Sequence, residues 1–347
     1  MALMLGIDIG GTKVAVGSVT KDGTVQGEIM EFPSPEGGPE EFVEALLEQL
    51  REARSRIEDD VLGVGVGCAG TIDWRERRVI ESPNLPLEDE PLGERIAKAL
   101  TLPVVLDNDA NTATLAEVRV GAAKGKSHVV MLTLGTGVGG GIVLDGSLYR
   151  GATGSAGELG HTIVKGNGGL CLCGRRGCLE QYASGSALER YARQIVDQGR
   201  LTGAAMVEAA GEAQGAADTA ADPPEDYAKR LRELAAADDL NGKSVGELAL
   251  DGDAAALDAV AEVAAWLGAG LANLANIFNP DMIVIGGGLS SLGDLLLEPA
   301  RELMEAYAIR PNGTVAQVAA AQLGNEAGVV GAALVAWEVL EDVTLPV

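Results

Sequence analysis

The sequence predicts an α/β protein of two lobes, built on a duplicated core of strand, glycine turn and strand. Residues 3–19, LMLGIDIGGTKVAVGSV, form an apolar strand pattern, turn at Gly10-Gly11 and resume as a second apolar strand. Residues 128–146, HVVMLTLGTGVGGGIVLDG, repeat this form about 125 residues later. A chain of 347 residues is long enough to bury a core in each of two lobes.

The other elements follow from apolar spacing in chain order. Phe42, Leu46 and Leu50 have helical spacing and predict a helix within residues 37–57. Residues 186–270 are rich in Ala and acidic residues with helical spacing, and surface loops are expected at 217–227 and 235–244. We also expect strands at 61–70 and 103–109, helices at 91–100 and 110–123, a strand followed by a glycine loop at 279–291, and a closing helix at 324–340.

The order of these elements suggests how the chain divides. We expect a small lobe of residues 1–120, completed by the C-terminal helix at 325–347, and a large lobe of residues 121–324. The small lobe would carry the first glycine turn and the acidic residues near position 109. The large lobe would carry the second glycine turn and a cluster of Cys and His residues.

The charge of the chain excludes some classes of partner. There are 51 Asp and Glu residues against 26 Lys and Arg, a net charge of −25 at pH 7. Nucleic acid and anionic membranes both need a positive surface, so we expect neither as a partner. An acidic, lysine-poor surface suggests adaptation to high salt, which screens self-repulsion. The start MALMLGIDIG lacks a basic leader, and four cysteines do not suggest a disulfide framework, so we expect a cytoplasmic protein without a membrane span.

The glycine turns are candidate phosphate-binding loops. Residues 121–127, GAAKGKS, have one residue too few between the glycines for a Walker A loop, and they follow a helical pattern. Residues 135–140, GTGVGG, continue as a strand rather than the helix that a dinucleotide-binding fold needs. Backbone N–H groups of the two hairpin turns can instead wrap phosphate, although such turns are common without a ligand. A third glycine loop at 286–288 favours a nucleotide, and the candidate contacts are Gly10, Gly11, Thr12, Lys13, Thr136, Gly137, Gly287 and Gly288.

Acidic side chains lie where a predicted strand meets a predicted helix. Asp107, Asn108 and Asp109 end the strand at 103–109 and precede the helix at 110–123. One reading is structural, because Asn and Asp are common helix N-caps. The other is functional, because open α/β sheets bind ligands at the carboxyl ends of their strands. Beside a helix N-terminus, Asp109 should favour its ionised form.

Three of the four cysteines and one of the two histidines lie within residues 157–181, GELGHTIVKGNGGLCLCGRRGCLEQ. Three thiolates and an imidazole form a closed tetrahedral zinc set, and a C-x-C spacing does not match a redox C-x-x-C motif. We therefore predict a structural zinc site. Its ligands would be His161, Cys171, Cys173 and Cys178, whereas Cys68 is isolated in an apolar strand and expected in the core.

Several motifs occur in the order seen in one protein family. DIGGTK, DNDANTATLAE, TLGTGVGGGIVLDG, GELGH, CLCGRRGCLE and NPDMIVIGGGLS resemble the ROK family of sugar kinases and related repressors, from residue 5 to about 335. The resemblance implies an actin-like, ribonuclease-H-type ATPase fold with ATP between two lobes. The chain is most similar to the members that phosphorylate glucose at its 6-hydroxyl with ATP. A homodimer or tetramer is also implied.

The resemblance assigns roles residue by residue. It implies that Asp109 is the catalytic base and that Asp8 holds Mg²⁺ through water. The sugar ligands that it implies are Gly70, Asn108, Asp109, Glu158, His161 and Glu180. The sequence has CAGTID where the family often has Pro-Gly-Pro, which weakens the assignment of Gly70.

Two alternatives stay open on the sequence. One is a kinase for N-acetylglucosamine, N-acetylmannosamine or fructose, because the acids would bind hydroxyls that these sugars share; ADP or polyphosphate also stays open as phosphoryl donor. The other is a sugar-sensing repressor. We do not expect it, since DIGGTK starts at residue 8 and the net charge opposes DNA binding.

Overall fold

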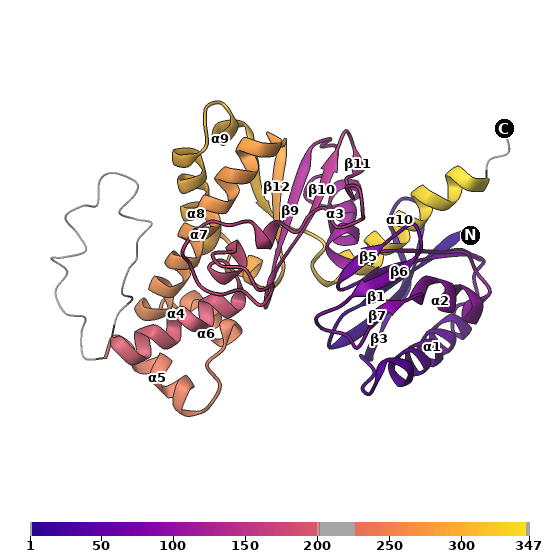
Figure 1. Cartoon of the computed structure of the whole chain (residues 1–347), viewed down its shortest axis with the longest axis horizontal. Coiled ribbons are helices and arrows are strands. Elements are labelled where there is room, and N and C mark those ends of the chain that lie inside the picture. The colour runs from indigo at the N-terminus through magenta and orange to yellow at the C-terminus, as the bar shows by residue number, and fades with distance from the viewer. Residues whose placement is uncertain (1, 200, 202–225, 345–347) are drawn as a thin grey trace. The chain divides into compact units, whose positions relative to one another are not determined.

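The first of two five-stranded sheets carries the first glycine turn. A computed structural model describes residues 2–199, 201 and 226–344. The sheet has the order β3-β2-β1-β4-β8, in which β1 pairs antiparallel with β2 and parallel with β4. Its strands are β1 (Leu3–Ile9), β2 (Lys13–Val19), β3 (Val25–Pro33), β4 (Val61–Cys68) and β8 (Val104–Asn108). Figure 1 labels β1 and β3 of this sheet, near α1 and α2.

The second sheet repeats the topology of the first. Its order is β11-β10-β9-β12-β13. If the strands of each sheet are numbered from one to five in chain order, both sheets have the order 3-2-1-4-5. The second glycine turn joins β9 to β10, as the first joins β1 to β2. The predicted duplication is thereby confirmed. The strands are β9 (Val129–Leu134), β10 (Val138–Leu144), β11 (Ser147–Leu148), β12 (Met282–Gly286) and β13 (Gln317–Ala320).

Helices cover both faces of the first sheet. Alternate strand residues such as Leu5 and Ile7 pack with α1 (Pro39–Ser55) and α2 (Leu92–Leu100). On the other face, the strand residues Met4, Ala15 and Val105 pack with α3 (Asp109–Arg119) and α10 (Ala327–Thr344). The period of two in the strands therefore fills two separate cores.

Glycine in a central strand lets α10 lie directly on the first sheet. A Cβ atom added to Gly65 would lie 1.7 Å from the carbonyl oxygen of Ala332 in α10. No side chain fits at that separation. Gly65 in the strand VLGVGVGC is thus required by helix packing.

A small three-stranded sheet was not predicted from the sequence. It contains β5 (Thr71–Asp73), β6 (Arg78–Glu81) and β7 (Glu88–Glu90). These strands are three or four residues long and carry charged residues, so no apolar periodicity marks them.

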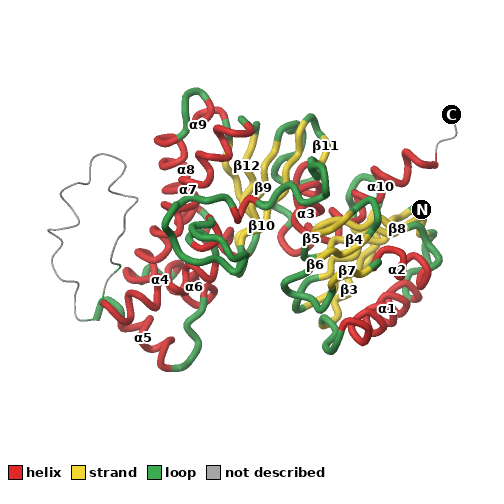
Figure 2. Tube along the Cα trace, viewed as in Figure 1, coloured by secondary structure: helices red, strands yellow, loops and turns green. Residues whose placement is uncertain are grey.

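The rest of the regular secondary structure in the described residues is helical (Figure 2). The long helix α7 packs against α8, α4 and α6. By length and hydropathy α7 matches a membrane span, but most of it is buried inside the protein, as in the core helix of a globular fold. The helices are α4 (Gly185–Gln198), α5 (Lys229–Ala236), α6 (Gly242–Leu250), α7 (Ala254–Phe278), α8 (Asp294–Tyr307) and α9 (Asn312–Val315).

The two predicted surface loops have different outcomes. Almost all of 217–227 lies outside the described residues. The other loop, 235–244, is wrong in part, because α5 extends to Ala236 and α6 begins at Gly242. The side chain of Asn241 caps α6 by accepting from the N–H groups of Lys243 and Ser244, which explains why a polar stretch is helical here.

The described residues form two compact units. The first comprises residues 2–129, 141–157 and 321–344, and the second comprises 130–140 and the described residues of 158–320. Helix α10 packs against α3 and β1 within the first unit.

Candidate active site

The junction of β8 and α3 brings three predicted site residues together in the first unit. The side-chain oxygen of Asn108 accepts from the N–H groups of Ala110 and Asn111, at 2.9 and 3.1 Å, and so caps α3. Its amide nitrogen donates to the carbonyl oxygen of Gly70 at 3.0 Å and to Asp109 Oδ1 at 2.9 Å. Asn108 is therefore the helix cap that the structural reading expected, and it also orients the Asp109 carboxylate.

Asp109 is held at the first position of α3 and is partly buried. Burial raises the pKa of Asp109, opposed by hydrogen bonds to Oδ1 from the N–H of Ala110 at 2.9 Å and from Asn108. Burial thus works against the ionised form that the helix N-terminus favours. A carboxylate whose pKa rises toward neutrality is a stronger general base.

Asp8 is a second carboxylate in the same unit. It lies on β1, one residue before the end of the strand, beside Gly328 in the first turn of α10. Burial raises its pKa to about 6, the negative charge of Asp109 adds to this, and Lys13 opposes it. Two carboxylates that repel one another form a donor set suited to a divalent cation, and Mg²⁺ prefers one or two carboxylates.

We expect Asp8→Asn to stabilise the free protein at neutral pH. In the unfolded chain the carboxyl ionises near 3.8 and in the folded protein near 6, so the stability that Asp8 contributes is complete below pH 4 and lost as the pH rises through 6. The shift corresponds to at most about 3 kcal/mol of unfolding free energy. Melting temperatures at pH 4 and pH 8 test this: the variant should melt several degrees higher only at pH 8. The matched control is Glu36→Gln, at an exposed position, which should not show this difference between the two pH values. Equal shifts in melting temperature at both pH values for Asp8→Asn would contradict the prediction.

The first glycine turn is short and partly exposed. The N–H of Gly10 donates to the carbonyl oxygen of Lys13 at 3.0 Å, and Thr12 accepts from the N–H of Ser34 at 3.1 Å. Lys13 pairs with the exposed Glu31. Asn84 lies against Gly11, where an added Cβ would be 3.2 Å from the Asn84 Cβ. Asn84, in the segment SPNLP at residues 82–86, therefore packs on this turn.

The predicted zinc ligands converge in the second unit. One ligand atom from each of His161, Cys171, Cys173 and Cys178 lies within 4.8 Å of all the others. Cys173 Sγ is 3.6 Å from Cys178 Sγ, and Cys171 Sγ is 3.7 Å from His161 Nδ1. Bonds of 2.3 Å from zinc to sulfur in a tetrahedron give an S–S separation of about 3.8 Å, whereas a disulfide needs about 2.05 Å. The four side chains fit zinc.

The two ring nitrogens of His161 face different partners. Nδ1 faces the cysteine cluster, while Nε2 is 3.9 Å from Glu158 Oε2. A metal-binding imidazole uses its second nitrogen for an outer partner. His161 can thus contact a metal and a polar ligand at once.

Two short 3-10 turns carry these groups. Glu158 directly precedes the turn Leu159–His161, and His161 is its last residue. Glu180 lies in the turn Leu179–Gln181. The N–H of Leu179 donates to the carbonyl oxygen of Thr162 at 2.8 Å, which ties the two turns together.

Glu180 also holds the second glycine turn. Its Oε2 accepts from the N–H of Val138 at 3.0 Å, and a Cβ atom on Gly137 would lie 2.4 Å from the same oxygen. A larger residue at position 137 would therefore displace the Glu180 carboxylate from its present place. Its predicted phosphate contact has no separate support in this geometry.

A cavity of about 480 Å³ opens beside the second turn, within the second unit. Thr136 and Gly288 line it, while Gly287 packs on the backbone of Leu134 in β9. The cavity has the size of a small-molecule site. Its other walls are partly apolar, with Leu134, Leu250, Leu289 and Leu292, and partly polar, with Ser186, Glu189, Asn241, Lys243, Glu247 and Ser291.

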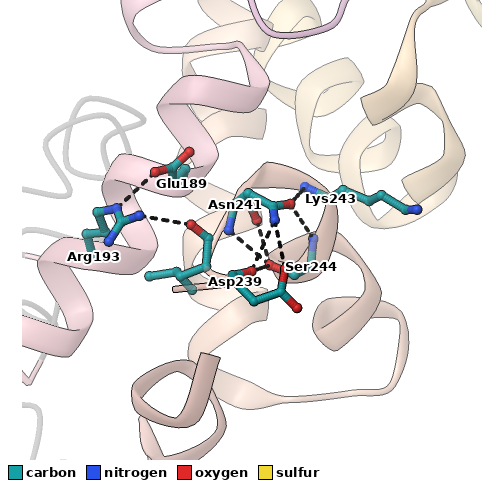
Figure 3. A network of polar contacts seen from close by, with 7 residues as sticks. Glu189, Arg193, Asp239, Asn241, Lys243 and Ser244 are labelled. Atoms are coloured by element: carbon teal, nitrogen blue, oxygen red, sulfur yellow. Dashed lines mark hydrogen bonds and ion pairs between the residues drawn. The ribbon is translucent and has the colours of Figure 1, made fainter. Parts of the chain in front are cut away.

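Sequence reasoning missed the part of the cavity wall formed by α4 and α6. Figure 3 shows how Asn241 and Ser244 bond to one another and to Asp239 at the start of α6, with Lys243 extending away. Arg193 joins this corner to α4 by bonding Glu189 and the carbonyl oxygen of Leu240. The capping pattern N-x-x-S at 241–244 was the signal that could have found α6.

Two sheets of identical strand order, each with a glycine turn between its first two strands, define an α/β protein of the actin-like ATPase class. The chain belongs to the ROK family, whose sequence model matches residues 4–339. The glucokinase of Streptomyces coelicolor is 40% identical over 341 residues, which cover 97% of this chain and 98% of that enzyme.

Solved structures of the same family show the fold. A ROK family glucokinase from Streptomyces griseus, in complex with glucose and AMPPNP, is 40% identical, with a TM-score of 0.76 and coverage of 97% of this chain and 99% of the other. A ROK hexokinase from Thermus thermophilus is 32% identical, with a TM-score of 0.74 and coverage of 98% and 99%.

Proposed function

We propose that this chain is a glucokinase, which transfers the γ-phosphoryl group of ATP to the 6-hydroxyl of glucose. The observation that carries the proposal is the Asp109 carboxylate, which is partly buried at a strand–helix junction and oriented by Asn108. Phosphoryl transfer depends mostly on positioning and charge stabilisation, with one carboxylate to accept the hydroxyl proton. Asp109 takes this role in the proposal.

Glu158, His161 and Glu180 act in this proposal on the sugar hydroxyls, together with Gly70 and Asn108. His161 Nε2 points away from the cysteines, and Glu158 is exposed. Carboxylates accept hydrogen bonds from sugar hydroxyls, and an imidazole N–H donates one. Zinc would brace the two turns that carry these groups. With all four of its positions filled by protein, it would have no open position for water.

The cavity beside Thr136 and Gly288 takes the nucleoside part of ATP in this proposal. Its leucine side chains suit an adenine ring, and its polar groups suit ribose hydroxyls. The two glycine turns act on the phosphates with Gly10, Gly11, Thr12, Lys13 and Gly137, and Gly287 supports the third loop. Mg²⁺, held by Asp8 through water, would neutralise charge on the phosphates.

We further propose a cytoplasmic homo-oligomer that works at high salt and binds neither nucleic acid nor membrane. The net charge of −25 supports the high-salt adaptation and opposes anionic partners. The second candidate function is a kinase that acts on other hexoses, and its support is the solved ROK hexokinase relative.

A substrate panel tests the proposal directly. ATP, ADP and polyphosphate are each combined with glucose, fructose, mannose and the two N-acetyl sugars, in low and in molar KCl. We expect ATP with glucose to give the highest kcat/KM, and the activity and melting temperature to rise in KCl. A higher kcat/KM for an N-acetyl sugar or for polyphosphate would overturn the assignment of substrate or donor.

A further inference from the structure

Asp107 is a buried carboxylate next to the proposed catalytic base, and the proposed chemistry does not use it. It is 2% exposed. Its Oδ1 accepts from the backbone N–H of Asn108 at 2.8 Å and from the side-chain amide of Asn111 at 2.9 Å. These two donors lie on either side of Asp109 in the chain. Asp107 therefore clamps the turn of backbone that carries Asp109.

Arg150 supplies the charge that such a buried carboxylate needs. Its Nε donates to Asp107 Oδ2 at 2.6 Å, and its side chain is 16% exposed. The guanidinium carbon lies 4.9 Å from the centre of the Trp74 ring. A charge-assisted bond on one side and an aromatic ring on the other fix the plane of the guanidinium.

Arg150 also lies close in the chain to Glu158, a proposed sugar ligand. Arg150 follows β11 and precedes Glu158 by eight positions in the chain. Its carbonyl oxygen accepts from the N–H of Ala156 at 3.2 Å, which closes the segment leading to Glu158. The Arg150 side chain thus anchors the base-carrying turn, and its backbone carbonyl closes the segment that leads to a proposed sugar ligand.

We propose that Arg150 and Asp107 are a positioning pair that sets the orientation of the Asp109 carboxylate, an inference that rests on the proposed phosphorylation of glucose. Neither residue touches the reacting atoms in this proposal. Phosphoryl transfer is sensitive to position, and a misplacement of about 1 Å can cost about 100-fold in rate. Loss of the pair should therefore lower kcat more than it weakens sugar binding.

The chain offers a matched control in Arg75. Its guanidinium carbon lies 5.1 Å from the centre of the same Trp74 ring, and it donates to the carbonyl oxygen of Ala152, but it bonds no carboxylate of the junction among the residues described. Arg75→Gln thus removes a guanidinium from the same ring while leaving Asp107 paired. A purely structural role of the Trp74 stack would make both variants behave alike.

The experiment compares wild type with Arg150→Gln, Asp107→Asn, the double variant and Arg75→Gln. Steady-state kcat and KM are measured with ATP and glucose, glucose Kd by calorimetry, and melting temperature in parallel. We expect Arg150→Gln to lower kcat by about 10- to 100-fold with glucose Kd changed less than threefold. Asp107→Asn should do the same, and the double variant should add little, because both changes break one unit.

The outcomes separate the inference from the proposed function. A kcat for Arg150→Gln equal to that of Arg75→Gln, with an active wild type, overturns the positioning pair alone. A wild type without kinase activity on glucose overturns both. If Arg150→Gln does not fold, Arg150→Lys carries the test, since lysine keeps the charge but not the planar fork; a kcat within twofold of wild type would then overturn the pair.

Discussion

Asp109→Asn is expected to abolish most turnover while the protein stays folded and binds glucose. General-base catalysis contributes about 10²- to 10⁴-fold in rate, so kcat should fall by that factor. The oxygen of an asparagine side chain can still accept the bonds that Asn108 and the N–H of Ala110 now give to Oδ1. Removal of a buried carboxylate whose pKa is raised should also leave the melting temperature unchanged or higher at neutral pH. Stopped-assay kcat, glucose calorimetry and thermal melting together check this result.

A matched Asp-to-Asn change should leave kcat at the wild-type value. Asp145 lies in the turn between β10 and β11 with its side chain 93% exposed, and its φ of 51° suits Asn. Asp145→Asn controls for the chemical change without touching the junction. If Asp109→Asn kept more than a tenth of the wild-type kcat, Asp109 would not be the base.

Cys173→Ser is expected to lower glucose affinity and stability together. Serine cannot replace a thiolate ligand, and the free energy of metal binding is part of the folding free energy of such a site. The cluster joins the turn that holds His161 to the segment that leads to Glu180. We expect loss of bound zinc by elemental analysis, a melting temperature lower by at least about 5 °C, and glucose Kd raised by about tenfold or more.

Cys68→Ala provides the comparison for the zinc variant. Cys68 is fully buried in β4, as predicted for a core residue, and it lies in the first unit, whereas the four cluster residues belong to the second. It should keep full zinc content and glucose affinity. A Cys173→Ser protein that lost only turnover, with zinc and glucose binding intact, would show that the cluster does not brace the sugar ligands.

Many of the secondary-structure elements and the zinc ligands of this protein could be predicted from local features of the sequence. The two glycine hairpins, the strand at β4 and the helix at α3 follow from apolar period and turn residues alone. The zinc set can be predicted for another reason: four ligands of two rare residue types cluster within eighteen positions, so the chain itself brings them near one another. Short polar strands such as β5 and β7 carry no such period, and their pairing depends on neighbours distant in the chain.

Functions of individual site residues depended more on the fold. The sequence allowed Asn108 to be a cap or a ligand, and the structure shows that it caps α3 and orients Asp109. The sequence suggested that Gly137 binds phosphate. In the structure, the atom nearest to a Cβ added at Gly137 is a carboxylate oxygen of Glu180, 43 positions further along the chain.

What the sequence determined by itself is the set of elements and ligand types, because periodicity, turns and closely spaced ligands are local properties of the chain. What only the tertiary structure decided is which polar groups meet. Arg150 reaches Asp107 across 43 positions, and Asn241 and Glu189 line one cavity from two helices. The physical reason is that a buried carboxylate or guanidinium must find its partner wherever the packed core places one, and no local pattern records that choice.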